Sequence, residues 1–171
     1  TDAMLYKGSA GPFSCGTNNH WRLAFRIDNK LEYLACNFTG SAAVQVQSSA
    51  DSVQLDVWTH VAAVHDVTAN PDTVTFYING NQTAVTYVSQ NDLTNASYNS
   101  SNLYIGSTLG TSNFFDGAID EIKIWNRSLS AQEINASFQA GRYRLITNIT
   151  NSDSKYADGN FTYYAAVVDA A

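Results

Sequence analysis

The sequence is poor in charge, and its basic residues are the scarcer kind. Nine Lys and Arg stand against fifteen Asp and Glu, which leaves a formal charge of −6. A protein that binds nucleic acid needs clustered positive charge for the phosphates, so we expect no nucleic-acid partner. The longest apolar run, Tyr163–Val168, is far shorter than the ~20 residues that cross a bilayer, so we also expect no membrane-inserted segment.

Cysteine is scarce too, with only Cys15 and Cys36. They form no Cys-x-x-Cys motif and no nearby histidine pair accompanies them, so zinc or redox chemistry is not indicated. A structural disulfide is favoured over two buried free thiols, and it fits an oxidising compartment.

Hydroxyl and amide side chains take the place of charge, because Ser, Thr and Asn together make 49 of the 171 residues. Asn-x-Ser/Thr triplets occur eight times, where roughly three would arise by chance. The excess predicts an exported, glycosylated protein at the cell surface or outside the cell. The alternative is that a chain rich in Asn, Ser and Thr contains such triplets without being glycosylated. The predicted acceptors are Asn37, Asn81, Asn95, Asn99, Asn126, Asn135, Asn148 and Asn160.

Two hairpins stand out in the pattern of short strands and turns. Trp21–Ile27 and Lys30–Cys36 flank Asp28-Asn29, which suits a two-residue turn. This pairing places Cys36 opposite Trp21 and leaves Cys15 within reach in the preceding loop. The second hairpin joins Trp58–His65 to Thr73–Asn79.

Further strands are expected on both sides of these hairpins. Asn79-Gly80 is a strong turn signal, from which 83–88 returns. The other predicted strands are Ala3–Lys7, Val44–Gln47, Leu103–Gly106 and Ala118–Trp125.

One helix is predicted after the strands. Ser130 and Glu133 have the spacing of a capping box, and Gly141 is placed to end the helix. Short strands with a single helix predict an all-β fold, an antiparallel sandwich in which two sheets cover each other's apolar faces.

Four stretches resemble, in this order, the laminin-G-like jelly-roll domain of the concanavalin A-like lectin and glucanase superfamily. They are Trp58–Asp66, Val74–Gly80, Leu103–Ser107 and Phe115–Ser130. The resemblance covers residues 1–141 and implies a jelly-roll sandwich with Trp58 and Trp125 in or beside its core. It also implies that the strand which usually opens the domain is missing, so that a sheet edge is exposed or is filled by another segment.

The remaining segment, residues 142–171, forms a second unit in this interpretation. Its end, Asp158–Ala171, resembles a late strand of the immunoglobulin-like modules that follow such domains in microbial, especially archaeal, surface proteins. Thirty residues are too few for such a module. The segment therefore docks on the sandwich, pairs with a neighbouring chain, or marks where the chain was cut.

Asp120 is the predicted metal ligand. By strand alternation it shares a side with Ile122 and Ile124, so its carboxylate points toward the apolar core and needs a partner. The resemblance implies that an aspartate in this "G-x-I-D-E-I" motif helps to hold a structural Ca²⁺ with main-chain carbonyls. The alternative is that loop amides donate hydrogen bonds to Asp120 without a metal.

No catalytic pair emerges, so we expect no enzymatic activity. Glycoside hydrolysis needs two carboxyl groups ~5–9.5 Å apart. Glu32 has no carboxylate two or four residues along its strand, Glu121 points away from its neighbour Asp120, and Glu133 caps the helix. The histidines, His20, His60 and His65, show no nucleophile in a recognisable arrangement.

Together these observations predict a non-catalytic extracellular module, structural or adhesive, of a glycosylated surface or filament-forming protein. Its expected partners are glycans or other surface proteins, with self-assembly by strand exchange as a further hypothesis. The alternative is a carbohydrate-binding module of a secreted protein, because sugar sites in β-sandwiches stack rings on aromatic side chains. The candidate rings, which also suit internal packing, are Trp21, Tyr33, Tyr77, Tyr87 and Tyr104.

Overall fold

The computed structural model describes residues 2–8, 15, 20–37, 42–93 and 101–142. These residues form nine strands and one helix: β1 (Asp2–Lys7), β2 (Trp21–Phe25), β3 (Leu31–Cys36), β4 (Ala42–Ser48), β5 (Val61–Asp66), β6 (Thr73–Ile78), β7 (Asn81–Thr83), β8 (Val85–Gln90), β9 (Leu103–Ile105) and α1 (Ala131–Arg142). The predicted second unit, residues 142–171, lies outside the described residues apart from Arg142.

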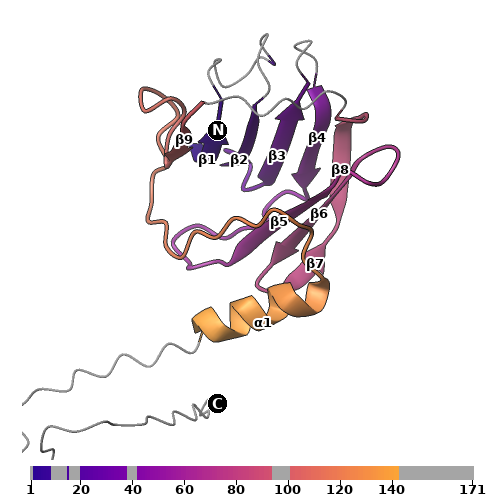
Figure 1. Ribbon diagram of the computed structural model, residues 1–171. Helices are drawn as coiled ribbons and strands as arrows, with labels where there is room; N and C mark the ends of the chain where they lie inside the picture. Colours follow the sequence, from indigo (N-terminus) through magenta and orange to yellow (C-terminus); the bar gives the residue numbers. More distant parts are fainter. Residues whose placement is uncertain (1, 9–14, 16–19, 38–41, 94–100, 143–171) are drawn as a thin grey trace, which may run out of the picture.

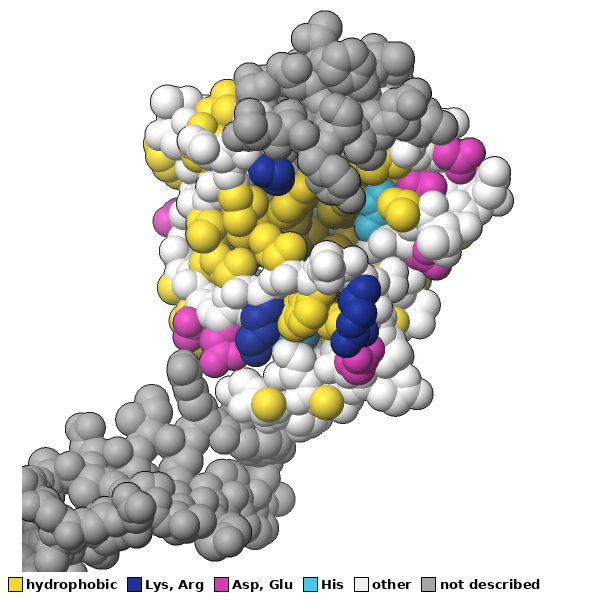
Figure 2. Space-filling model, viewed as in Figure 1, with side chains coloured by type: hydrophobic (Ala, Val, Ile, Leu, Met, Phe, Trp, Pro, Cys, Tyr) yellow, Lys and Arg dark blue, Asp and Glu magenta, His cyan; other side chains and the backbone are white. Residues whose placement is uncertain are grey.

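Two antiparallel sheets of unequal width face each other (Figure 1). The large sheet has the order β8-β4-β3-β2-β1-β9, and the small sheet has the order β5-β6-β7. The all-β sandwich prediction is therefore confirmed. Because six strands face three, the small sheet covers only part of the large one, and apolar side chains gather on the face seen in Figure 2.

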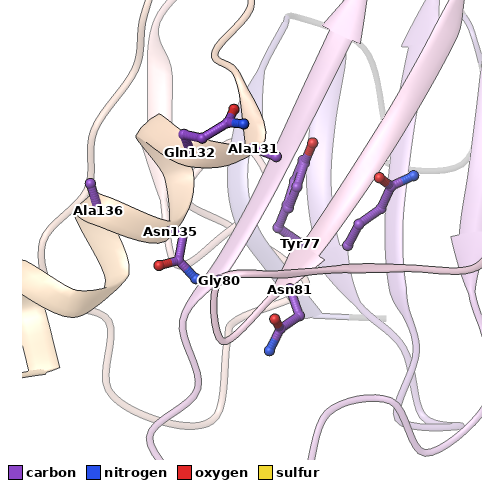
Figure 3. Close-up of a pocket in the computed structure, with 8 residues that line it drawn as sticks. Tyr77, Gly80, Asn81, Ala131, Gln132, Asn135 and Ala136 are labelled. Atoms are coloured by element: carbon purple, nitrogen blue, oxygen red, sulfur yellow. The ribbon is translucent and has the colours of Figure 1, made fainter.

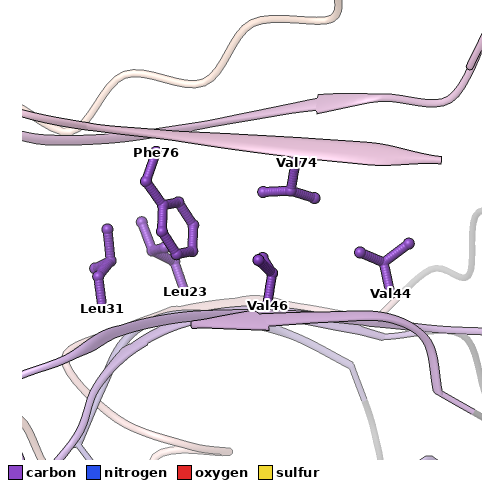
Figure 4. Packing of buried hydrophobic residues seen from close by; sticks show 6 residues of the cluster. All are labelled: Leu23, Leu31, Val44, Val46, Val74 and Phe76. Atoms are coloured by element: carbon purple, nitrogen blue, oxygen red, sulfur yellow. The ribbon is translucent and has the colours of Figure 1, made fainter. Parts of the chain in front are cut away.

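The core lies where the sheets overlap. Alternate residues of β2, β3 and β4 point inward and meet the inward side chains of β6 (Figure 4). Burying such side chains away from water is the main favourable contribution to folding, about 1.5–3 kcal/mol for each large aliphatic or aromatic group. The six core residues are Leu23, Leu31, Val44, Val46, Val74 and Phe76.

The β2–β3 hairpin forms, but its register differs by one residue from the prediction. Trp21 pairs with Ala35 rather than with Cys36, because the turn has three residues between Arg26 and Lys30 instead of two. Asn29 alone in this loop takes a positive φ, 55°, which matches a three-residue hairpin loop that ends in a left-handed residue.

The predicted Asn79-Gly80 turn is confirmed. Both residues have positive φ, 49° and 76°, as a two-residue hairpin turn requires, and Ile78 pairs with Asn81 across it. The returning strand is not continuous as expected. It leaves the small sheet after β7, passes Ala84, and continues as β8 in the large sheet.

The predicted strand Ala118–Trp125 is wrong, since this segment is irregular. Glu121 has a positive φ of 51°, which interrupts an extended run. The two isoleucines expected to face the core are exposed, Ile122 by 37% and Ile124 by 56%. Apolar alternation alone does not make a strand, because a strand also needs a neighbour with which to pair.

The placement of Trp58 and Trp125 in or beside the core is also wrong, since both side chains are exposed. Trp58 precedes β5 rather than belonging to it, and Trp125 lies in the irregular segment. Neither therefore receives the inward orientation that a strand position would give it.

The helix begins as predicted. The Ser130 N–H donates to the Glu133 carboxylate at 2.9 Å, and the Glu133 N–H donates to the Ser130 hydroxyl at 3.3 Å, which completes the capping box. The helix includes Gly141 in its last turn instead of ending before it. The Ile134 side chain of α1 is buried.

Candidate functional site

The most concentrated polar chemistry among the described residues lies on the outer face of the large sheet, around Glu32 of β3. The Glu32 side chain is fully buried, and that of Arg22 on β2 is 4% exposed. Arg22 Nη2 donates to Glu32 Oε1 at 2.5 Å, and Arg26 Nη1 donates to Oε2 at 3.0 Å. Two amides of β4 complete the set, with Gln47 at 2.8 Å and Gln45 at 3.1 Å from Oε2.

These contacts determine the protonation of Glu32. Burial alone would raise the pKa of the carboxyl, but the charge and hydrogen bond of Arg22, with the amides of Gln47 and Gln45, hold the pKa below its ordinary value. Glu32 is therefore a carboxylate at neutral pH. A general acid needs the opposite, a raised pKa, so this cluster suits structural pairing more than proton transfer.

A second polar chain joins the two sheets. The Tyr33 hydroxyl of β3 lies 3.1 Å from His65 Nδ1 of β5, and His65 Nε2 lies 3.0 Å from the buried Asp72 carboxylate. The Leu93 N–H also donates to that carboxylate. Burial lowers the pKa of His65, although Asp72 opposes this, while burial and Asp72 raise the pKa of Tyr33.

This arrangement resembles a relay of acid and base groups, in which the Tyr33 phenol is the terminal group. The phenol lies between the sheets, and its raised pKa keeps it protonated, so it is a weak nucleophile. The chain therefore acts as a cross-sheet brace, in which His65 is neutral and hydrogen-bonded on both nitrogens. His60 directly precedes β5, and its ring lies in a tilted contact with the ring of Phe138 of α1.

The predicted disulfide between Cys15 and Cys36 is present, with a Cα–Cα distance of 5.4 Å. Cys36 is buried at the end of β3, and His20 Nε2 lies 3.3 Å from its sulfur. These three residues form the one group of metal-ligand type found among the described residues, but the disulfide occupies both sulfurs. The geometry thus favours a covalent staple over a metal site.

Asp120 lies in the irregular segment and is exposed. Its Oδ1 accepts a hydrogen bond from the Glu121 N–H at 2.8 Å. Within the described residues, no group of three or more His, Cys, Asp or Glu side chains includes Asp120. Ca²⁺ takes about six to eight oxygen ligands, so the described side chains alone do not fit it, and calcium binding stays a prediction.

Four of the eight predicted glycosylation sites lie in the described residues. Asn81 and Asn126 are exposed, as an acceptor must be. Asn135 is half-buried on α1, where it lines a cleft together with Gly80, and Asn37 has a buried Oδ1. The others lie outside the described residues: Asn95, Asn99, Asn148 and Asn160.

A shallow cleft separates the first turns of α1 from the β6–β7 hairpin (Figure 3). Its volume is about 460 Å³. Tyr77 supplies an aromatic wall, and the polar lining is four amide side chains: Asn81, Gln82, Gln132 and Asn135. Amides both donate and accept hydrogen bonds, which matches the hydroxyl groups of a sugar.

Two of the candidate rings for sugar binding are engaged inside the fold. The Tyr87 hydroxyl accepts from the Val74 N–H at 2.8 Å and donates to the Val74 carbonyl at 3.1 Å, and the Tyr33 hydroxyl contacts His65. Trp21 and Tyr104 are half-buried on the large sheet. Only Tyr77 lines the cleft.

The comparison with protein families agrees with this fold. A family model described as the concanavalin A-like lectin/glucanases superfamily matches residues 6–135. Among solved structures, the chain is similar to the 2.1 Å crystal structure of an S-layer domain-containing protein (residues 221–444) from Clostridium thermocellum, with 23% identity and a TM-score of 0.35. That similarity covers 72% of this chain and 58% of the other.

No curated protein matches the chain. Within the described part of the chain, no helix has both the length and the apolar character to span a bilayer.

Proposed function

Because the chain belongs to the concanavalin A-like lectin/glucanases superfamily, we propose that it is a non-catalytic extracellular module of a glycosylated surface protein, with a structural or adhesive role. The observation that carries this proposal is the exposure of Asn81 and Asn126 on a domain stapled by a disulfide. Disulfides persist in oxidising compartments, and N-glycans are attached to exposed acceptors of exported proteins.

The chemistry around Glu32 supports the non-catalytic part of the proposal. Both oxygens of this carboxylate are already engaged by arginine and glutamine side chains, and its pKa is lowered. A retaining or inverting glycosidase needs one carboxyl group that stays protonated near neutral pH. Glu32 is poorly suited to that role.

Glycopeptide mapping tests the proposal. The protein, isolated from its native host, is digested and each acceptor is scored by mass spectrometry. We expect glycans at Asn81 and Asn126, whose side chains are exposed, and an unmodified Asn135, because Asn135 is half-buried on α1. Thr83→Ala removes the Asn81 triplet and serves as the matched control. Unmodified asparagines at all eight triplets would remove the main support.

A second candidate function is carbohydrate binding at the amide-lined cleft. The cleft is lined by one aromatic side chain and several amides, a lining that suits weak binding of a sugar. The test is a glycan array with and without Ca²⁺, comparing the natural protein with Gln132→Ala and with Gln54→Ala as a control outside the cleft. No signal in the natural protein would exclude this candidate.

The two candidate functions, glycosylation of a surface module and sugar binding at the cleft, both involve Asn81. Its side chain is both a glycan acceptor and part of the cleft lining. A glycan on Asn81 would occlude the cleft, so enzymatic deglycosylation should raise any sugar binding there. Equal binding before and after deglycosylation would place the sugar site elsewhere.

A further inference from the structure

Three side chains of metal-ligand type meet where β3 ends beside the start of β2 (Figure 1). The ladder that pairs Trp21 with Ala35 extends one step further, since the Cys36 N–H donates to the His20 carbonyl at 2.9 Å. Directly opposite residues of two paired strands place their side chains on the same face, so His20 and Cys36 meet. Cys15 joins them through the disulfide.

The His20 side chain is held in place by its neighbours on β1. Its ring centroid lies 5.8 Å from that of Tyr6, which is fully buried. Gly8 follows β1 directly and packs so closely that an added Cβ would collide with the Cβ of His20. The histidine is only 3% exposed, and its Nε2 lies 3.3 Å from the Cys36 sulfur. The fold therefore keeps an imidazole nitrogen beside the disulfide.

The spacing of the three ligand atoms suits a metal ion. The two sulfurs and the histidine nitrogen all lie within 4.8 Å of one another. Tetrahedral Zn²⁺ holds sulfur at about 2.3 Å and nitrogen at about 2.0 Å, so neighbouring ligand atoms are about 3.5–3.8 Å apart. The nitrogen and the Cys36 sulfur already lie close to that separation, at 3.3 Å. Breaking the disulfide frees the two sulfurs to adopt it as well.

We propose that Cys15, His20 and Cys36 bind Zn²⁺ when the disulfide is reduced, with water at the fourth position. Reduction needs a dithiol, which is oxidised to its own disulfide while its two electrons and two protons convert the two half-cystines to thiols. The thiols then lose their protons to solvent as Zn²⁺ binds. Zn²⁺ with two thiolates and a neutral imidazole has no net charge, which suits ligands as inaccessible as His20 and Cys36.

The difference in exposure between the two sulfurs gives the reductant its point of entry. Cys15 is half-buried, whereas Cys36 is 1% exposed. The first thiolate of the dithiol therefore attacks Cys15, and Cys36 leaves as a thiolate. In either redox state Cys15 stays tied to the end of β3, through a covalent bond or through the metal. Metal binding requires neither glycosylation nor sugar binding.

Titration of the full 171-residue chain with Co²⁺ tests the proposal. The chain is reduced with dithiothreitol, and the reductant is removed under exclusion of air before Co²⁺ is added. Charge transfer from thiolate to Co²⁺ gives a near-ultraviolet absorption band, which reports sulfur ligands directly. We expect this band to saturate at one Co²⁺ per reduced chain and to be absent from the oxidised chain. Displacement of Co²⁺ by Zn²⁺ then gives the Kd for Zn²⁺.

Two histidine variants separate the site from capture by free thiols. His20→Ala should raise the Kd for Zn²⁺ by at least about tenfold, because even a side chain that only supports a metal ligand contributes that much. His60→Ala is the matched control, since His60 lies outside the cluster, and it should leave the Kd unchanged.

Circular dichroism of each reduced chain, with and without Zn²⁺, monitors the fold. If the reduced natural chain unfolds, recovery of its β-sheet spectrum on addition of Zn²⁺ supports the proposal, because the metal then stabilises the folded state. A reduced chain that unfolds and is not restored by Zn²⁺ would overturn it.

Two results of the titration would also overturn the proposal. One is a reduced chain that binds Zn²⁺ no more tightly than the oxidised chain. The other is an equal Kd for the natural protein and His20→Ala, since the two thiols alone would then capture the metal. A sulfur-ligated Co²⁺ in the reduced chain, weakened in His20→Ala and unchanged in His60→Ala, supports it.

Discussion

Replacing Glu32 by Gln should lower the free energy of unfolding by about 3 kcal/mol, because it leaves the buried Arg22 guanidinium without its carboxylate. Breaking a buried ion pair costs about 3–5 kcal/mol, and both members are nearly inaccessible here, at 0% and 4% exposure. We expect a cost at the lower end of this range, because the glutamine oxygen still accepts one hydrogen bond. In addition, the Arg26 side chain is 30% exposed, so water can solvate its charge.

Urea denaturation followed by tryptophan fluorescence measures this loss in the free energy of unfolding. In thermal denaturation, the same loss should lower the melting temperature of a chain of this length by about 6–12 °C. Glu121→Gln is the matched control, because its pair with Lys123 is exposed and worth less than about 1 kcal/mol. The double variant Arg22→Leu/Glu32→Leu should be more stable than Glu32→Gln, since no charge is then left buried. A Glu32→Gln cost no larger than that of Glu121→Gln would refute the reasoning.

Three further predictions concern the hairpin, the helix cap and the pH response. Gly80→Ala should lower the free energy of unfolding, measured by urea denaturation, by about 1–2 kcal/mol, because Gly80 has φ +76° and an added Cβ would lie 2.9 Å from Phe138. Gly110→Ala should lower it less, because Gly110 has a similar φ but room for a Cβ. Hydrogen bonds from its arginine partner and from the cap hold the pKa of Glu133 at about 2, so NMR should show the cap's stabilisation complete above pH 4.5 and lost as pH falls through about 2. Burial lowers the pKa of His65 below 6.5, so the free energy of unfolding should begin to fall as pH drops below 6.5; a flat profile from pH 7 to 5 would contradict this.

Features governed by local chemistry could be predicted from the sequence. Asn79-Gly80 has two residues that tolerate positive φ, and Ser130 with Glu133 supplies both halves of a cap, so neither needs information from the rest of the fold. The Asp28-Asn29 turn was harder, because only Asn29 takes the left-handed conformation and the loop gains one residue. That single residue shifts every pair of the hairpin.

Features that depend on a partner could not be predicted in the same way. The alternation in Ala118–Trp125 suits a strand, but no strand of the described residues pairs with it. Glu32 has no carboxylate nearby along its own strand, and its partners come from β2, β4 and the turn after β2. Such a cluster becomes visible only once the strand order and register are known.

The passage of the chain from β7 to β8 has a mechanical consequence. One continuous stretch belongs to both layers, and Tyr87 bonds it to Val74 of the facing layer. The sheets therefore cannot separate without disrupting the strand pairing of β7 or β8 and the two hydrogen bonds of Tyr87. We expect the two layers to come apart in a single step, so that fluorescence and circular dichroism report coincident denaturation curves. A load applied to either layer would be shared with the other at this crossing.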